Sequence, residues 1–170
     1  MPLDTVAILA EAEQQAQASQ REAGVRERRH LLIFAWNDEW YAVDLRHVRE
    51  VAKVGQISSI PGTPPSVLGA MNLRGEILAV ADARPELGLP PGKLTEGSRL
   101  IVVHDQDLVA GLLVDAVRDT VEVAASSLEK PLSTLDPGLV EFLEGQVTLD
   151  NDTLVSVINV PHLLAKMKGE

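Results

Sequence analysis

Four histidines are the first candidates for chemistry in this chain, because imidazole is the commonest metal ligand and a frequent general base. They are His30, His47, His104 and His162, and no two of them have the close spacing that places two metal ligands on one strand or one helix. The stretch HDQD, which begins at His104, falls where a hairpin turn is expected, and aspartate in turns requires no metal. We therefore expect no metal site.

Two further motifs resemble ligand-binding loops but differ from them in detail. Asp150-Asn151-Asp152 lacks the glycine and the downstream glutamate of a calcium loop. The stretch GLPPGK, from Gly88 to Lys93, has three residues between its glycines where a phosphate loop has four, and its prolines lack amide donors. No serine lies in a nucleophile-elbow pattern, and the chain has no cysteine. These features argue against an enzyme and against a bound cofactor.

Arg74 is the charged residue whose surroundings are hardest to explain. With Gly75 it separates two apolar runs in the stretch GAMNLRGEILAVADAR, residues 69–84, and both runs have the pattern of a strand. Gly75 suits a turn between strands because glycine adopts positive φ without steric cost. For Arg74 two explanations remain open: it belongs to the same turn, or it contacts a partner.

Composition and charge limit the classes of partner. The 170 residues carry a net charge of −10, which repels nucleic-acid phosphates and anionic lipid. No apolar run is long enough to span a bilayer, and the N-terminus lacks the basic start and apolar middle of a signal peptide. We expect a cytoplasmic protein that binds no nucleic acid and does not insert into the membrane.

The chain changes its pattern at His30. Residues 1–29 are rich in alanine, glutamine, glutamate and arginine, and we expect them to form a helical or flexible extension, either frayed or docked. From His30 onward apolar and polar residues alternate in short runs, which predicts strands. Asn37-Asp38 and Arg74-Gly75 each supply the turn of a predicted hairpin.

The second half of the chain repeats the pattern of the first. One constant offset along the sequence matches Leu31 with Leu100 and Glu50 with Asp119, and a slightly larger offset matches Gly69 with Gly145. Two units are too few for a solenoid. The repeat predicts two similar β-barrels of about five short strands each, and the lack of long helices between strands argues against a doubly wound α/β fold.

Four blocks of the sequence resemble the CheW family of chemotaxis adaptors. LLIFAWNDEWYAVDLRHVREV and ISSIPGTPPSVLGAMNLRGEILAVADAR resemble the first half of the family, and LIVVHDQDLVAGLLVDAVRDTVEV and EGQVTLDNDTLVSVINVPHLL resemble the second. The resemblance preserves the order and spacing of the blocks, and its NLRGEIL core is specific. It implies a mainly β fold of two SH3-like five-stranded β-barrels packed side by side in residues 30–165, with 1–29 as an N-terminal helical appendage and 166–170 as a C-terminal tail.

The family resemblance also implies a function. CheW-like proteins are non-enzymatic scaffold adaptors that couple the cytoplasmic tips of methyl-accepting chemoreceptors to the regulatory domain of a CheA-type histidine kinase. Both proteins would then be partners, and the chain would be recruited from the cytoplasm to membrane-bound receptor arrays without a cofactor. Modest contacts become a durable array because each later contact forms at high effective concentration.

Carried over residue by residue, the resemblance implies a receptor and kinase interface of Val48, Glu50, Gly69, Arg74 and Val102. Glu50 and Arg74 match an acid and a base that are paired beside the receptor-binding groove. Val48 and Val102 match apolar contacts to the receptor helix, and Gly69 lies where added bulk disturbs assembly. Val48 is equally well explained as a core residue. An exposed Glu50–Arg74 pair would contribute about 0 to 1 kcal/mol, whereas breaking a buried one would cost about 3 to 5 kcal/mol.

The chain departs from the family at a few positions. Ala79 and Ala83 replace the usual proline and leucine, and Asn159-Val160-Pro161 replaces an acidic run. These departures leave open which receptor and kinase are recognised, and whether the pathway controls flagella or type IV pili. One alternative is a regulatory β-barrel domain that binds a metabolite between its two units. A second is an enzyme, which would require clustered titratable groups.

Overall fold

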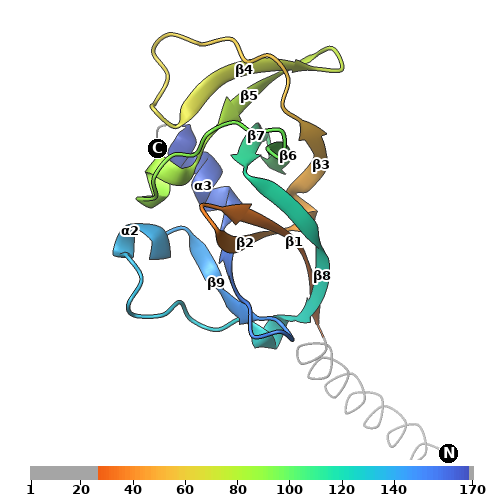
Figure 1. Ribbon diagram of the computed structural model, residues 1–170, viewed down its shortest axis with the longest axis vertical. Helices are drawn as coiled ribbons and strands as arrows, with labels where there is room; N and C mark the ends of the chain where they lie inside the picture. The colour runs from red at the N-terminus through yellow and green to blue at the C-terminus, as the bar shows by residue number, and fades with distance from the viewer. Residues whose placement is uncertain (1–26, 169–170) are drawn as a thin grey trace, which may run out of the picture.

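The computed structural model describes residues 27–168, and it is mainly β, with two five-stranded sheets and two α-helices in that range (Figure 1). The strands of sheet A are β1 (Arg28–Trp36), β2 (Glu39–Asp44), β8 (Ala116–Ala124), β9 (Leu143–Thr148) and β10 (Leu154–Ile158). The strands of sheet B are β3 (Val48–Lys53), β4 (Val67–Leu73), β5 (Glu76–Ala81), β6 (Arg99–Asp105) and β7 (Leu108–Val114). The helices are α2 (Pro137–Val140) and α3 (Val160–Met167).

The prediction of a mainly β fold with two five-stranded units is confirmed, but the two sheets are not closed barrels. Sheet A has the order β8-β1-β2-β10-β9 and sheet B the order β3-β6-β7-β5-β4, and within residues 27–168 the two edge strands of a sheet do not pair with each other. The outer edges of β4 and β9 are instead occupied by the preceding loops, through bridges from Ser58 to Ala70 and from Glu129 to Gln146. Each sheet therefore stays open between its edge strands.

The sequence repeat is present in the structure in an interleaved form. The repeat matches β1 to β5 with β6 to β10, yet sheet B consists of the consecutive strands β3 to β7, so each sheet takes strands from both halves. Replacing every strand of sheet A by its repeat counterpart gives the strand order of sheet B. Both sheets also contain one parallel pair at the same place, β2 with β10 and β7 with β5. The two halves are thus related by an approximate internal symmetry.

The first hairpin of the chain has the turn that the sequence predicts. Asn37 and Asp38 have φ of 50° and 70°, and they connect Trp36 to its partner Glu39. Two consecutive residues with positive φ are typical of a type I′ turn, which suits the twist of paired strands, and asparagine and aspartate tolerate this conformation. The predicted Asn37-Asp38 hairpin is confirmed.

Two glycines in equivalent positions of the repeat are required by close backbone contacts. A Cβ at Gly69 would overlap the carbonyl oxygen of Ser58, and a Cβ at Gly145 would lie 2.7 Å from the carbonyl oxygen of Glu129. These two carbonyls belong to the loop segments that cover β4 and β9. The match between Gly69 and Gly145 in the sequence repeat therefore reflects a shared packing requirement.

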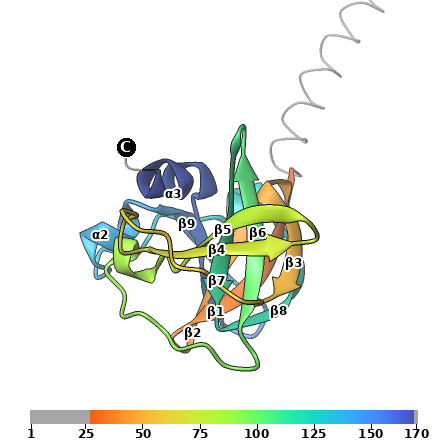
Figure 2. The same ribbon diagram turned by 90° about the horizontal axis from the view of Figure 1, so that it is seen from above.

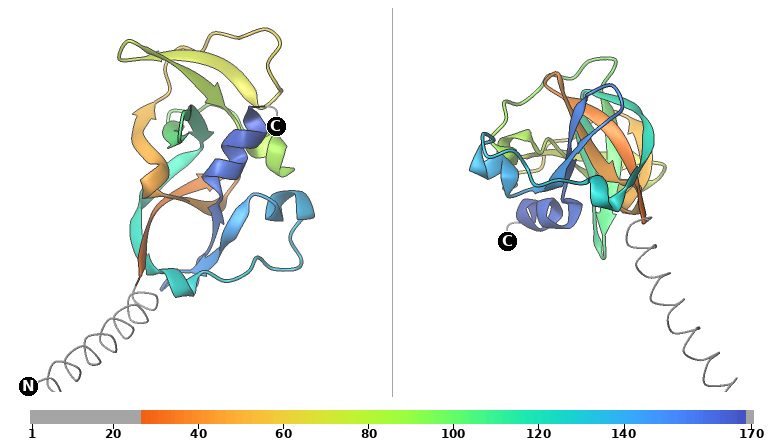
Figure 3. Two further views of the ribbon diagram at one scale, coloured as in Figure 1. Left: turned by 180° about the vertical axis from the view of Figure 1, so that it is seen from behind. Right: turned by 90° about the horizontal axis from the view of Figure 1, so that it is seen from below.

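The main hydrophobic core lies between the two sheets and under α3. Trp36 is fully buried there, and its indole nitrogen donates a hydrogen bond of 2.8 Å to the carbonyl of Leu113, which joins the sheets. From α3, Leu163 and Leu164 pack into the same core, which also contains Ile101 of β6. Figure 2 shows α3 beside sheet B from above, and Figure 3 shows it from behind and from below. No helix among residues 27–168 is both long and apolar enough to cross a membrane.

A buried arginine ties the two sheets together. Arg84 is fully buried, and its guanidinium donates hydrogen bonds to Asp82 (2.8 Å), to Asp115 (2.8 Å) and to Asn37 (3.2 Å). Burial by itself would lower the pKa of Arg84, but the two carboxylates outweigh burial and hold this pKa above its ordinary value. Because Asp82 follows sheet B and Asn37 lies in the β1–β2 turn of sheet A, this cluster fixes one sheet against the other.

A second charge cluster joins β1 to β9. Arg29 donates hydrogen bonds to Asp44 (2.5 Å) and to Glu144 (2.8 Å). Burial would raise the pKa of Asp44, but hydrogen bonds from the Arg46 amide and the Arg29 guanidinium, with the charges of both arginines, give a net lowering of that pKa. Asp44 is thus held as a carboxylate.

The predicted ends of the domain can be compared with the element boundaries. Residues 1–26, which make up most of the predicted extension 1–29, lie outside the described residues. The last residues of that range already belong to β1, which begins at Arg28. At the other end α3 continues to Met167, slightly beyond the predicted domain end at 165.

Candidate functional site

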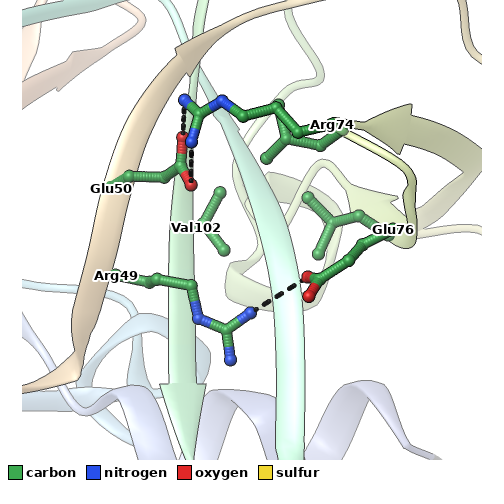
Figure 4. A pocket seen from close by; sticks show the side chains of 7 residues that line it. Arg49, Glu50, Arg74, Glu76 and Val102 are labelled. Atoms are coloured by element: carbon green, nitrogen blue, oxygen red, sulfur yellow. Dashed lines mark hydrogen bonds and ion pairs between the residues drawn. The ribbon is translucent and has the colours of Figure 1, made fainter.

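A cleft of about 340 Å³ lies between the edge strand β3 and the β4–β5 hairpin of sheet B (Figure 4). We call it the β3–β4 cleft, and it is lined by Arg49, Glu50, Leu73, Arg74, Glu76, Leu78 and Val102. Three of the five predicted interface residues, Glu50, Arg74 and Val102, are brought together here from segments far apart in the sequence. The cleft exists because β3 and β4 do not pair and leave the sheet open.

Glu50 and Arg74 form a two-pronged ion pair across the cleft. The two terminal guanidinium nitrogens of Arg74 donate hydrogen bonds of 3.1 and 2.5 Å to the two carboxylate oxygens of Glu50. Such paired bonds fix the geometry as well as the charge. The Arg74 side chain is 72% exposed and that of Glu50 is 23% exposed, so the pair adds about 0 to 1 kcal/mol to stability. The predicted pairing is confirmed, and it is of the exposed kind.

The backbone at Arg74 answers the question of whether this residue belongs to the turn. Arg74 and Gly75 have φ of 51° and 88°, and they connect Leu73 to its partner Glu76. The Asn72 side chain accepts a hydrogen bond of 2.9 Å from the Gly75 amide. Arg74 is therefore a turn residue in a left-handed conformation, which costs a non-glycine residue about 1 kcal/mol or more. Turn geometry alone would favour glycine or asparagine here.

A second ion pair crosses the cleft beside the first. The Arg49 guanidinium lies 3.5 Å from the Glu76 carboxylate, and both side chains are largely exposed. Figure 4 shows the two ion pairs on either side of Val102. Sequence reasoning missed this pair, although the patterns Arg49-Glu50 and Arg74-Gly75-Glu76 place opposite charges next to both predicted residues. That alternation of charge was the available signal.

Val102 forms an apolar floor beneath the charges. It is 1% exposed and is the direct cross-strand partner of Glu50 in the β3–β6 pairing. Leu78 is buried at the same floor, and Leu73 packs against the core of sheet B. The cleft therefore offers an apolar base with charged walls.

The other two predicted interface residues lie outside the cleft. Val48 is half-buried and packs against the main core, so its side chain is partly a core residue. Gly69 is buried, and its environment is the carbonyl of Ser58. A larger residue at Gly69 would therefore disturb the packing of the fold before it affected an interface. The interface roles of all five residues remain predictions.

The charges of the cleft form pairs of opposite sign that cross it. Within residues 27–168, no three histidine, aspartate or glutamate side chains are placed to hold a metal ion. In the cleft, each acid pairs with a base from the opposite wall: Glu50 of β3 pairs with Arg74, and Glu76 of β5 pairs with Arg49. A partner that enters the cleft can exchange these exposed ion pairs for its own.

Comparisons with known proteins give a consistent result. The family model of the CheW-like domain matches residues 30–168. A chemotaxis protein CheW of Bacillus subtilis is 26% identical over 148 residues, which cover 87% of this chain and 94% of that protein. A chemotaxis protein CheW of Helicobacter pylori is 27% identical over 158 residues, which cover 93% of this chain and 94% of that protein.

A solved structure agrees in fold. The crystal structure of the scaffolding protein TtCheW from Thermoanaerobacter tengcongensis superposes with a TM-score of 0.70 and is 33% identical in sequence. The match covers 79% of this chain and 86% of that chain. Both the fold of this chain and its sequence therefore have a counterpart in a scaffolding protein.

Proposed function

The chain belongs to the CheW-like domain family, and on this premise we propose that it is a non-enzymatic scaffold adaptor of a chemosensory signalling array. The family match over residues 30–168 is the observation that carries this proposal. The relatives that support it are named chemotaxis proteins, and the structural relative is named a scaffolding protein. The comparisons do not support the alternative of a metabolite-binding regulatory barrel.

The partners that we propose are the cytoplasmic tip of a methyl-accepting chemoreceptor and the regulatory domain of a CheA-type histidine kinase. The adaptor would be recruited from the cytoplasm to membrane-bound receptor arrays. The β3–β4 cleft supports this role because it combines an apolar floor with exposed, exchangeable ion pairs. We propose that Glu50, Arg74 and Val102 act at this surface, and that Val48 and Gly69 support it from the adjoining core.

The geometry of the Glu50–Arg74 pair is the feature that favours recognition over a purely structural role. The pair is too exposed to add much stability, and Arg74 adopts a conformation that glycine or asparagine would adopt at lower cost. An arginine side chain at this turn is therefore explained better by a contact than by the turn.

Co-sedimentation tests the proposal. Membranes that carry chemoreceptors are mixed with the CheA-type kinase and the full chain, and the pelleted adaptor is measured. We expect the chain to pellet with receptor and kinase and to raise the amount of kinase in the pellet. A chain that stays in the supernatant under conditions where the kinase and receptor are competent would contradict the adaptor role.

A further inference from the structure

The internal symmetry places a second groove in sheet A where sheet B has the β3–β4 cleft. This groove, of about 460 Å³, lies between the edge strands β8 and β9, and we call it the β8–β9 groove. Its lining includes Arg118, Asp119, Val121 and Val123 on β8, and Leu149 and Asp150 after β9. The repeat relates β3 to β8 and β4 to β9, so the two openings are counterparts.

The correspondence extends to individual lining residues. The sequence offset that matches Leu31 with Leu100 also takes Arg49 and Glu50 of the cleft to Arg118 and Asp119 of the groove. The offset that matches Gly69 with Gly145 takes Leu73 to Leu149, and the next residue, Arg74, to Asp150. The four cleft residues and their four counterparts all line their respective opening.

The two openings differ in charge at the positions of the Glu50–Arg74 pair. In the β3–β4 cleft Glu50 binds Arg74, but the counterparts of these residues are Asp119 and Asp150, two acids. Within residues 27–168, neither aspartate has an ion-pair or side-chain hydrogen-bond partner. The guanidinium carbon of Arg118 lies 5.2 Å from the centre of the Trp40 ring, and Arg118 forms no ion pair with either aspartate within residues 27–168. Arg28 also lines the groove, but it lies 3.8 Å from Glu122, so no basic residue in the described part of the chain is paired with Asp119 or Asp150.

The groove also has an apolar wall and an open strand edge. Val121 and Val123, on the same face of β8, line it and are only half-buried, and Leu149 lines it from the loop after β9. The edge of β8 away from β1 pairs with no strand in the described residues. An unpaired edge beside alternate apolar side chains is suited to an added strand.

We propose that the β8–β9 groove binds an extended segment of another protein that carries an arginine or lysine flanked by apolar side chains. The basic residue binds Asp119 and Asp150, and it supplies from the partner the charge that Arg74 supplies within the chain in the β3–β4 cleft. The apolar neighbours cover Val121 and Val123. Charge complementarity favours this occupant, because an unpaired acid lies on each side of the groove and an acidic segment would be repelled.

The chain itself provides a suitable probe. Residues 71–78 of the β4–β5 hairpin, MNLRGEIL, contain Arg74 next to Leu73 and close to Ile77, and they are the segment that supplies the arginine in the counterpart opening. A linear, fluorescein-labelled peptide of this sequence is titrated with the full chain and followed by fluorescence anisotropy. A second peptide carries Arg74→Gln. We expect the arginine peptide to bind about tenfold more tightly, since a charge-assisted bond is lost in the second.

Variants of the full chain locate the site. Asp119→Asn with Asp150→Asn is expected to weaken binding of the arginine peptide about tenfold, whereas Asp107→Asn, which changes an exposed acid in the β6–β7 turn outside both openings, is expected to leave its affinity unchanged. Both aspartates are exposed, so we expect the variants to fold, and circular dichroism is the check. Absence of binding, equal affinity of the two peptides, or an equal loss in the Asp107→Asn control would overturn the proposal.

Sedimentation equilibrium of the full chain excludes a different occupant. We expect a monomer at the concentrations used for anisotropy. A dimer that the Asp119→Asn and Asp150→Asn changes dissolve would show that a second copy fills the groove, and it would overturn the assignment to another protein.

Discussion

Arg74 binds the carboxylate of Glu50 through two hydrogen bonds, of 3.1 and 2.5 Å, from a turn in which its own backbone has a φ of 51°. The ion pair spans the opening between β3 and the β4–β5 hairpin, above the buried side chain of Val102. The side-chain contact and the backbone conformation of Arg74 thus favour different residue types at this position. The pair requires an arginine, and the turn would favour a smaller residue.

This opposition predicts the effect of Arg74→Asn on stability. Asparagine tolerates the left-handed conformation, which compensates for the loss of an exposed ion pair. We expect the free energy of unfolding to change by less than about 1 kcal/mol. Urea unfolding measures it, with Arg74→Ala as a comparison that loses the pair without the benefit of asparagine. A loss of several kcal/mol in Arg74→Asn would show that the pair is structural.

Gly69→Ala is expected to destabilise the fold. A Cβ at this position overlaps the carbonyl oxygen of Ser58, so the backbone of β4 or of the covering loop must move. We expect a loss of about 2 to 3 kcal/mol, as for overpacking in a core. Gly62→Ala is the matched control, because Gly62 also has positive φ, at 80°, but open space around it. The control should lose only about 1 kcal/mol, and equal losses in the two variants would contradict the close-contact explanation.

Arg84→Met is expected to be among the most destabilising changes of a charged residue in the described chain. It leaves the buried carboxylate of Asp82 without its partner, and breaking a buried ion pair costs about 3 to 5 kcal/mol. Arg49→Met removes an exposed pair and serves as the control, with an expected loss below about 1 kcal/mol. Thermal and urea unfolding of both variants measure the difference. A small loss in Arg84→Met would show that the two sheets do not depend on this cluster.

The lowered pKa of Asp44 predicts a loss of stability in acid. The carboxylate is favoured in the folded state, so its contribution is fully present above the unfolded pKa, near 3.8, and is lost as the pH falls through the lower folded pKa. Asp44→Asn should lower stability at neutral pH by about 1.5 to 3 kcal/mol and flatten the dependence on pH below about 5. Urea unfolding across this range measures both. An unchanged slope would assign the acid sensitivity to other carboxylates.

The sequence predicted the local features of the fold better than its long-range pairings. Alternation of apolar residues located the strands, and Asn37-Asp38 and Arg74-Gly75 located the hairpin turns, because these signals depend on neighbouring residues. The repeat indicated two similar units, but it could not show that their strands are exchanged between the sheets. Pairing depends on which edges meet in space, and alternation is the same for either partner.

The candidate site shows the same limit. The family resemblance led to Glu50 and Arg74, whereas the Arg49–Glu76 pair and the buried Arg84 cluster were not predicted. The partners of Arg84 lie as far away as Asn37 and Asp115, and no local pattern distinguishes a buried arginine from an exposed one. The carbonyl that requires Gly69 belongs to Ser58, in the loop before β4, and strand patterns do not show which loop covers a strand.

The affinity of the full chain for its proposed partners is the measurement that tests the central claim most directly. Binding to the CheA-type regulatory domain is measured by calorimetry, and binding to receptor membranes by co-sedimentation. Both methods compare the unchanged chain with the Arg74→Asn variant at equal folded fraction. Arg99→Asn is the control, because it changes a basic residue outside the cleft. We expect Arg74→Asn to weaken receptor or kinase binding about tenfold or more, while Arg99→Asn leaves it unchanged. Full binding by a folded Arg74→Asn chain would contradict the role of the β3–β4 cleft in recognition.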